Sequence, residues 1–214
     1  DQCLDLPDKI YTKLSYDLDD YQQEYFLALK EYESTRTSKN KDSKLALHTL
    51  NVITAKSKVS KIKELVEGIT SDVITVDGKT RGKKVVIFTS YTEPIKMIET
   101  LFPFNCLKID GSIDSKKRLD IVNEFKKSDD IKILVANITA AGIGLNIVDE
   151  TITDVIFLNF PFTQAELDQA IDRLHRIGQK NTINVYYTVC RDSIDEKLYS
   201  LLTRKYKDTS TLID

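Results

Sequence analysis

The sequence has few cysteines, no long apolar run and no excess of charge of one sign. Its three cysteines, Cys3, Cys106 and Cys190, are odd in number and far apart, so neither a disulfide framework nor a metal site with paired ligands is indicated. No apolar run approaches the ~20 residues that a membrane span requires. The N-terminus DQCLDLPDKI also lacks the basic start and apolar core of a signal peptide. We therefore expect an intracellular chain with no membrane partner.

Charge is nearly balanced over the whole chain but unevenly distributed along it. The 214 residues include 31 Lys and Arg against 33 Asp and Glu, a formal net charge of −2, which argues against a generally basic nucleic-acid binder. Residues 1–33 are rich in Asp and Glu, whereas residues 36–63 and 79–84 are dominated by Lys and Arg. A basic run is more often a solvated face than a binding site, so it gives weak support for contact with phosphate.

Two regions of the chain differ in hydrophobic pattern. Residues 19–33 and 42–69 carry apolar residues at helical spacing, which predicts a helical N-terminal part. From about residue 71, short apolar runs alternate with helical patterns. The predicted strands are VVIF (85–88), CLKI (106–109), IKILVA (131–136), DVIFL (154–158) and INVYYTV (183–189), and the predicted helices are 93–101, 114–127, 163–176 and 192–204. This alternation predicts an α/β fold, an open doubly wound parallel sheet covered on both faces.

The segments that follow these strands are candidates for function, because ligands of such sheets gather at the carboxyl ends of the strands. They are TSY (89–91), DGS (110–112), NITAAGIGLN (137–146) and NFPF (159–162). All but the last are rich in small or hydroxyl residues, which let a phosphate approach and supply hydrogen-bond donors. Turn formation alone accounts for any single loop of this composition. Several such loops in one lobe favour a binding edge.

One apparent phosphate-binding motif is dismissed. DGKT (77–80) is similar to the end of a phosphate loop, but the pattern G-x-x-x-x-G-K-[ST] requires a glycine where the sequence has Val73. A strand rather than a helix is predicted to follow. We interpret this segment as an exposed loop.

The stretch DQAIDRLHRIGQ concentrates charge in a predicted helix. Arg173 and Arg176 are three residues apart and share one helical face, with Gln169 one turn earlier. Two neighbouring guanidinium groups repel each other unless an anion lies between or opposite them, and their planar forks suit phosphate oxygens. The alternative is a surface helix with salt bridges to Asp172 and Glu166, which spacing alone favours.

Five segments resemble, in order, the second motor lobe of the SWI/SNF-type superfamily 2 ATPases, the chromatin remodelers and their bacterial, archaeal and viral relatives. They are KVVIFTSY (84–91), KIDGSIDSKKRLDIVNEFK (108–126), ITAAGIGLNI (138–147), DVIFLNFPFTQAELDQAIDRLHRIGQ (154–179) and INVYYTVCRDSIDEKL (183–198). QAIDRLHRIGQ is the most specific of them. DLPDKIYTKLSYDLDDYQQEYF is similar to the segment that joins the two lobes, although Asp8 replaces a proline there. The resemblance implies an inter-lobe linker and helical segment over 1–70 and a RecA-like C-terminal lobe over 71–214.

The resemblance also implies a nucleotide site shared between two lobes. ATP in these motors binds between RecA-like lobes, and the first lobe holds the phosphate loop and the carboxylates for Mg²⁺. The 214 residues would then act with an N-terminal RecA-like lobe that belongs to the same full-length chain. ATP and Mg would be the cofactors, and the 214 residues would supply no metal ligand. Arg173 and Arg176 match the arginines that face the γ-phosphate. Gln169 matches the polar residue that begins the motif, and Gly144 and Asn146 match the turn near the ribose.

The same resemblance implies contacts with the backbone of double-stranded DNA. The residues that match DNA-contacting positions are Ser90, Gly111 and Ser112 in loops, and Arg118 on the helix that follows. Many relatives have Thr-Arg where this chain has Ile138 and Thr139, so we expect Thr139 to supply the hydroxyl. The ITAA run is similar to that of the annealing-helicase branch. His175 matches a position of the arginine motif for which we expect a packing role.

Two functions remain open. The first is one lobe of an ATP-driven translocase that moves along duplex DNA without separating its strands, in which Arg173 and Arg176 complete the ATP site. On this hypothesis the isolated chain folds but does not hydrolyse ATP. The second is a non-catalytic α/β platform that binds DNA or protein. The arginine pair beside Gln169 favours the motor, because a binding module has no reason to keep both at this spacing.

Overall fold

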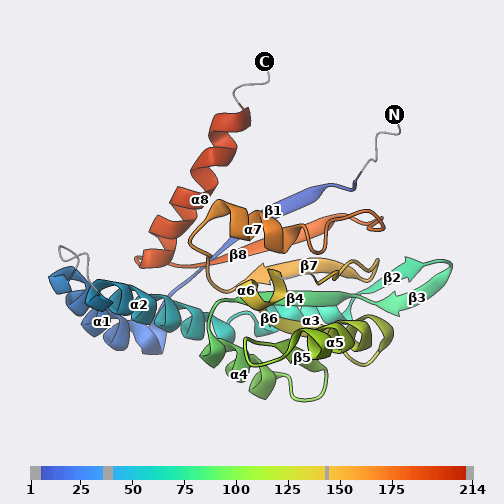
Figure 1. Cartoon of the computed structure of the whole chain (residues 1–214), viewed down its shortest axis with the longest axis horizontal. Coiled ribbons are helices and arrows are strands. Elements are labelled where there is room, and N and C mark those ends of the chain that lie inside the picture. Colours follow the sequence, from blue (N-terminus) through green and yellow to red (C-terminus); the bar gives the residue numbers. More distant parts are fainter. Residues whose placement is uncertain (1–5, 36–40, 143–144, 211–214) are drawn as a thin grey trace.

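A six-stranded sheet forms the centre of the computed structural model, which describes residues 6–35, 41–142 and 145–210. The strand order is β1-β8-β7-β4-β6-β5, and every neighbouring pair is parallel (Figure 1). The strands are β1 (Lys9–Tyr16), β4 (Lys84–Thr89), β5 (Cys106–Ile109), β6 (Ile133–Asn137), β7 (Ile152–Phe157) and β8 (Ile183–Cys190). The five predicted strands are thus confirmed as β4 to β8, and so is the prediction of an open parallel sheet.

Strand β1 was not predicted, and it lies in the segment that the resemblance assigned to the linker. It pairs with β8 along its whole length, from Lys9 opposite Ile183 to Tyr16 opposite Cys190. Its other edge carries no strand, and its residues are exposed or half-buried. The central strands β4 and β7, in contrast, are buried at every position. An edge strand lacks the continuous apolar run that marks a strand covered on both faces.

Helices cover both faces of the sheet, as predicted. One face is covered by α5 (Ser115–Lys127), α6 (Ile138–Gly142), α7 (Gln164–Ile171) and α8 (Ile194–Ser210). The other face is covered by α3 (Lys63–Ser71) and α4 (Thr92–Leu101). Within β4, Val86 and Phe88 enter the first core while Val85 and Ile87 enter the second. This alternation shows why a doubly covered strand has an unbroken apolar sequence.

Side-chain caps fix where two of these helices begin. The Asp114 carboxylate accepts a hydrogen bond from the Lys117 backbone N–H at the start of α5, at 3.0 Å. The Thr163 hydroxyl accepts one from the Glu166 N–H at the start of α7, at 3.3 Å, and donates to the Glu166 carboxylate at 2.9 Å. Each cap satisfies a backbone donor that has no partner within the helix.

The predicted helical N-terminal part is confirmed. It consists of the short 3-10 helix η1 (Asp19–Tyr21), then α1 (Gln22–Thr35), α2 (Lys41–Val59) and α3. Helices α1 and α2 share a small core of their own, formed around Tyr25, Ala28, Leu50 and Ile53. The domain boundary expected after residue 70 falls inside α3 and stays a prediction. The segment DGKT (77–80) was interpreted as an exposed loop. It forms the turn and the first two residues of the second strand of an antiparallel hairpin, β2 (Val73–Val76) and β3 (Lys79–Gly82). The hairpin projects from the lobe (Figure 1).

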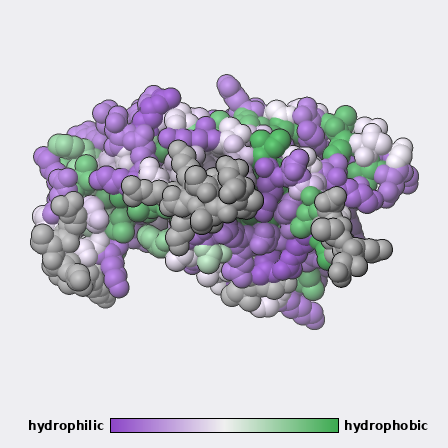
Figure 2. Space-filling view, turned by 90° about the horizontal axis from the view of Figure 1, so that it is seen from above, coloured by the Kyte–Doolittle hydropathy of each residue, from purple (hydrophilic) through white to green (hydrophobic). Residues whose placement is uncertain are grey.

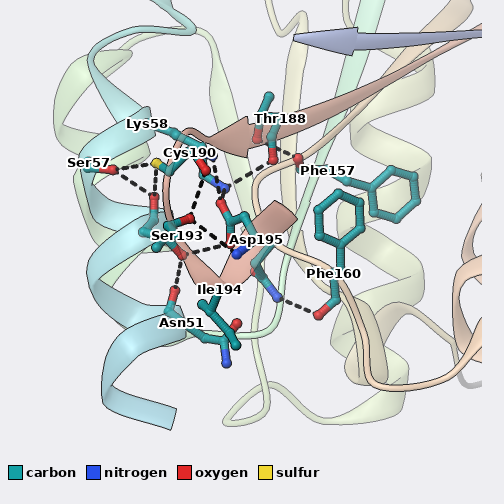
Figure 3. Close-up of polar contacts among 12 residues, drawn as sticks. Asn51, Ser57, Lys58, Phe157, Phe160, Thr188, Cys190, Ser193, Ile194 and Asp195 are labelled. Carbon is teal, nitrogen blue, oxygen red and sulfur yellow. Dashed lines mark hydrogen bonds and ion pairs between the residues drawn. The ribbon is translucent and has the colours of Figure 1, made fainter. Parts of the chain in front are cut away.

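A buried polar cluster joins the N-terminal helices to the sheet (Figure 3). The Lys58 ammonium on α2 donates to the Asp195 carboxylate at the start of α8, at 2.5 Å, and to the Thr188 carbonyl on β8, at 3.1 Å. Asp195 also accepts from the Thr54 hydroxyl at 2.9 Å and from the Cys190 backbone N–H at 3.0 Å. These bonds fix α2 against the end of β8 and the beginning of α8.

The surface is mixed in character. Hydrophilic side chains cover most of the coloured face seen from above, with hydrophobic ones in small patches between them (Figure 2). Within the described ranges, no helix is both long enough and apolar enough to cross a lipid bilayer.

Candidate functional site

The two arginines lie beyond the end of a helix, which corrects the prediction of a helix over 163–176. Helix α7 ends at Ile171, and the chain continues through irregular turns that contain Arg173 and Arg176. Two residues beyond this end, the Arg173 carbonyl accepts a tertiary hydrogen bond from the Ile147 backbone N–H, at 3.1 Å. The two guanidinium groups therefore belong to a fixed turn, not to one face of a helix.

Buried polar groups hold this turn, residues 172–180, which we call the arginine loop. The Gln179 side chain, 5% exposed, donates from Nε2 to the carbonyls of Asp149 and Ile152, both at 3.2 Å. Its Oε1 accepts from the backbone N–H groups of Lys180 and Asn181, both at 3.0 Å. All of its hydrogen-bonding capacity is thus used within the fold, which anchors the loop at the start of β7.

His175 and Gly178 add two further constraints to the arginine loop. The His175 ring, 9% exposed, forms a hydrogen bond from Nε2 to the Pro7 carbonyl at 2.5 Å. Gly178 has a φ of +103°, a left-handed conformation that favours glycine. The packing role expected for His175 therefore has a specific partner, 168 residues away in the chain.

The exposure of the three predicted catalytic residues differs. Arg176 and Gln169 are exposed, whereas Arg173 is half-buried. Among the residues that the structure describes, none forms a side-chain hydrogen bond or ion pair with Arg176. The alternative interpretation, a surface helix with salt bridges, required Asp172 and Glu166 as partners of the arginines. In the structure Asp172 pairs with Lys9, at 3.8 Å, and Glu166 accepts from the Thr163 hydroxyl.

A pocket of about 610 Å³ opens beside Arg176. Its walls are formed by Leu6, Lys9, Asn146, Asp172, His175, Arg176 and Ile177. The structure thus brings Asn146 and Arg176, both assigned to the nucleotide from the sequence, to one cavity. Gly144, assigned with them, lies outside the described residues.

Asn146 is held in place from two sides. Its side-chain Oδ1 accepts a hydrogen bond from the Val148 backbone N–H at 3.1 Å, and its carbonyl accepts from the Lys126 ammonium at 2.7 Å. Burial lowers the pKa of Lys126, while the Coulombic attraction of Asp149 raises it. The exposed Asn146 side chain therefore sits on a short segment of fixed backbone.

The candidate DNA-contacting residues lie at the carboxyl ends of three adjacent strands, β4, β6 and β5. Ser90 follows β4 and is held by two asparagines. Asn159 accepts from the Ser90 backbone N–H at 2.9 Å and donates to its hydroxyl at 3.1 Å. Asn137, the last residue of β6, donates to the Ser90 carbonyl at 3.0 Å. These two asparagines were not singled out from the sequence. Asn137 ends β6 and Asn159 follows β7, so their position after buried strands could have identified them as candidates.

The loop after β5 carries Gly111 and Ser112, and both are exposed. The Ser112 hydroxyl donates to the Asp110 carboxylate at 2.5 Å, and the Ser112 N–H donates to the same oxygen at 2.9 Å. The hydroxyl hydrogen bond holds the pKa of Asp110 below its usual value. This turn presents the Gly111 backbone to solvent.

Arg118 links two of these loops instead of pointing away from them. Its Nε donates to the Ile113 carbonyl at 2.7 Å, and its NH1 donates to the Ala140 carbonyl at 3.1 Å. Thr139 lies one residue before Ala140 and is exposed, with its backbone N–H bonded to Asn137 at 3.0 Å. Arg118 therefore fixes the loop after β5 against α6.

The two sets of candidate residues lie at opposite edges of the sheet. The DNA set follows the ends of β4, β5 and β6. The arginine loop packs against the start of β7 through Gln179, and Asn146 lies beside it. The candidate DNA-contacting residues thus lie at the carboxyl ends of the strands, where candidate functional groups were expected. The arginine loop lies at the opposite ends of the strands.

The six-stranded parallel sheet with helices on both faces is the fold of a RecA-like lobe. Residues 57–178, more than half of the chain, match the family described as "Helicase conserved C-terminal domain". The chain belongs to this family, and the resemblance to SWI/SNF-type superfamily 2 ATPases is confirmed.

Curated relatives and a solved structure support this assignment. The chain is 26% identical over 216 residues to "DNA annealing helicase and endonuclease ZRANB3" of Homo sapiens, covering 98% of this chain and 19% of that protein. It is 29% identical over 151 residues to "ATP-dependent helicase FUN30" of Saccharomyces cerevisiae, covering 69% of this chain and 12% of that protein. The chain therefore spans a fifth or less of the length of these relatives.

The fold is similar to that of a crystal structure described as the C-terminal part of the Fun30 ATPase domain. The TM-score is 0.68 at 18% sequence identity, covering 92% of this chain and 90% of that one. At this identity the similarity supports the fold alone.

Proposed function

We propose that this chain is the second motor lobe of a DNA-dependent ATPase of the SWI/SNF type, which translocates on duplex DNA. Its ATP site is completed by an N-terminal RecA-like lobe of the same protein. The observation that carries this proposal is the placement of Arg176, exposed and without an ion pair among the described residues, at a pocket that also contains Asn146. A cation held in this way is available to an anion that arrives from outside the lobe.

The residues at this pocket fit a nucleoside triphosphate. The Arg176 guanidinium suits the oxygens of a γ-phosphate, and Asn146 suits the ribose. The half-buried Arg173 does not line the pocket and is assigned to the γ-phosphate by its place in the motif. An arginine finger offsets the charge that spreads over the transferred oxygens, and it is worth on the order of 10³–10⁵ in rate where it has been dissected. Gln169 is exposed on α7, one turn before the loop, and does not line the pocket; its assignment to the site rests on its place in the motif.

The metal is assigned to the other lobe. Across residues 6–35, 41–142 and 145–210, no group of three or more His, Cys, Asp or Glu side chains is placed to hold a metal ion. It is the resemblance to two-lobed motors that assigns the Mg²⁺ accompanying ATP to the N-terminal lobe, where it would neutralise phosphate charge. The contribution of this chain is the positive charge of its arginines.

DNA is proposed to bind at the opposite edge of the sheet. The Gly111 N–H and the hydroxyls of Ser90 and Thr139 would donate hydrogen bonds to the phosphate backbone. Ser112 would do so by exchanging its Asp110 acceptor for a phosphate oxygen, and Arg118 would hold these loops in register. Contacts of this kind are salt-dependent and carry almost no sequence information. Closing and opening of the two lobes on ATP would then move the protein along the duplex. The name of the human relative, which includes DNA annealing helicase, supports DNA as the substrate.

ATP turnover by the 214-residue chain and by its full-length parent, each with and without duplex DNA, tests the shared site. We expect the chain alone to fold but to show no turnover, and the parent to show turnover that DNA stimulates. Turnover by the isolated chain that Arg176→Ala leaves unchanged would contradict a site divided between two lobes. A parent that binds DNA without hydrolysing ATP under any condition would instead favour the non-catalytic platform.

A further inference from the structure

We propose that His175 is a positioning residue that ties Arg176 to the segment preceding β1. This proposal rests on the proposed function, since the role of Arg176 does. The segment consists of residues 6–8 together with Lys9, the first residue of β1, and we call it the entry segment. Movement of the entry segment would displace the arginine loop, so that the ATP site would respond to the chain that enters this lobe.

The contact between His175 and Pro7 is directional. The Pro7 carbonyl can only accept a hydrogen bond, so the Nε2 atom, 2.5 Å away, must carry the proton. His175 is 9% exposed and Pro7 is half-buried, so the ring nitrogen that lost this acceptor would be left without a partner on the buried side of the contact. The geometry thus fixes both the tautomer and the orientation of the ring.

Two further contacts hold the entry segment at the same place. The Asp8 carbonyl accepts a hydrogen bond from the Ile183 backbone N–H at 3.0 Å, which aligns the entry segment with the start of β8. The Lys9 ammonium lies 3.8 Å from the Asp172 carboxylate, an exposed and therefore weak pair. Leu6 and Lys9 also line the pocket that contains Arg176. The entry segment is thus one wall of the proposed nucleotide site.

His175 and Arg176 are consecutive residues of the arginine loop. Both line the pocket, but the His175 ring is buried while Arg176 is exposed. The His175 backbone N–H donates to the Ile171 carbonyl at 3.1 Å, and the Arg176 carbonyl accepts from the Gln179 N–H at 2.9 Å. Any shift of the imidazole therefore moves the backbone from which Arg176 projects. A displacement of about 1 Å at such a site costs on the order of 10² in rate.

Two substitutions separate the hydrogen bond from the packing. His175→Phe keeps a flat ring but cannot donate to Pro7. His175→Gln loses the ring but places an amide N–H near the position of Nε2. His48→Phe serves as a matched control, because His48 is the other histidine of the chain and packs edge-on against Tyr91, with ring centroids 5.0 Å apart.

Amide hydrogen exchange on the 214-residue chain tests the coupling without any enzymatic activity. The Ile183 N–H reports on the entry segment through Asp8, and the Ile147 N–H reports on the arginine loop through Arg173. We expect His175→Phe to accelerate exchange at both amides by about tenfold or more. His175→Gln should restore most of the protection, and His48→Phe should leave both amides unchanged. Faster exchange at Ile183 alone, or at neither amide, would overturn the proposal.

Steady-state ATP hydrolysis by the full-length parent then tests whether the coupling acts through Arg176. We expect His175→Phe to lower kcat by about 10- to 100-fold with little change in KM, because the arginine acts in the transition state. Combined with Arg176→Ala, it should lower kcat no further than Arg176→Ala does alone. Additive losses would show that His175 does not act through Arg176 and would overturn the proposal. Normal turnover by an Arg176→Ala parent would instead contradict the proposed function. The exchange experiment would still test, independently of that result, whether His175 couples the entry segment to the arginine loop.

Discussion

The ammonium group of Lys58 and the carboxylate of Asp195 form an ion pair that is completely excluded from solvent. Nζ and Oδ2 are 2.5 Å apart, and both side chains have 0% exposure. The two residues are 137 positions apart, so the pair joins the N-terminal helices to the C-terminal helix. The carboxylate also accepts from the Thr54 hydroxyl and the Cys190 N–H, so every charge in the cluster is compensated.

Removing one member of this pair should be strongly destabilising. Lys58→Met would leave the buried carboxylate without its counter-charge, and we expect a loss of about 3–5 kcal/mol in the free energy of unfolding. Urea unfolding of the 214-residue chain measures this loss. The exposed pair of Lys117 and Asp114, 3.7 Å apart, provides the control, because Lys117→Met should change stability by less than about 1 kcal/mol. Similar losses for both variants would contradict a specific role for the buried pair.

Strand β1 should be required for the stability of the sheet, although it lies in the predicted linker. Deleting residues 1–16 removes eight residues of parallel pairing and exposes the edge of β8. We expect a loss of at least about 3 kcal/mol, which corresponds to roughly 6–12 °C in Tm for a chain of this size. Thermal unfolding followed by circular dichroism checks this. Deletion of residues 1–5 alone is the control, and an equal Tm for both truncations would contradict the expectation.

The sequence predicted the central strands well because a strand covered on both faces must be apolar throughout. VVIF and the VIFL part of DVIFL are such runs, and they fall in β4 and at the end of β7, strands that are buried at every position. The segment KIYTKLSY instead alternates charged, hydroxyl and apolar residues, and its pairing with β8 comes from a contact 174 positions away, as between Lys9 and Ile183. No local pattern encodes a partner at that distance.

The end of α7 was mispredicted for a similar reason. Leu174 is buried and continues the helical periodicity of α7, so the sequence favours a longer helix. In the structure α7 ends at Ile171, and the Arg173 carbonyl instead accepts a hydrogen bond from the Ile147 N–H of another loop. The identity of the arginines could be inferred from their motif, but their placement in a turn and the link from His175 to Pro7 depend on tertiary contacts.

Stability should fall with rising pH above pH 10, in part through Tyr25. Burial raises the pKa of the Tyr25 phenol to about 12, partly offset by the hydrogen bond that it accepts from the Ile194 N–H. In the unfolded chain the phenol ionises near its ordinary value of about 10. Between these values the unfolded state holds fewer protons, so its population increases as pH rises. Below pH 10 this group contributes no pH dependence.

Tyr25→Phe isolates this contribution. Urea unfolding between pH 9 and 11.5 should show a shallower decline above pH 10 in the variant, by at most ~1.4 kcal/mol per pH unit for one group. The variant is also expected to be less stable at neutral pH, because the Ile194 N–H loses its acceptor. Parallel pH profiles for the two proteins would contradict a raised pKa at Tyr25.

Arg118 should support DNA binding by holding loops, not by contacting phosphate. Its guanidinium already donates to the carbonyls of Ile113 and Ala140. In the full-length parent, Arg118→Ala should weaken duplex DNA binding by roughly tenfold while leaving the slope of log K against log salt unchanged. A direct phosphate contact would instead lower that slope by about one. Fluorescence anisotropy at four or more salt concentrations separates the two outcomes.

The most direct test of the motor hypothesis is DNA-stimulated ATP hydrolysis by the full-length parent with Arg176→Ala, measured together with ATP affinity. Arg176 is exposed, so the substitution should leave the fold intact, and unfolding of the 214-residue variant checks this. An arginine that acts on the γ-phosphate in the transition state predicts a loss of about 10³-fold or more in kcat, with ATP affinity largely unchanged. Equal turnover by the variant and the wild type would contradict it, and the arginine loop would then be a surface feature of a non-catalytic platform.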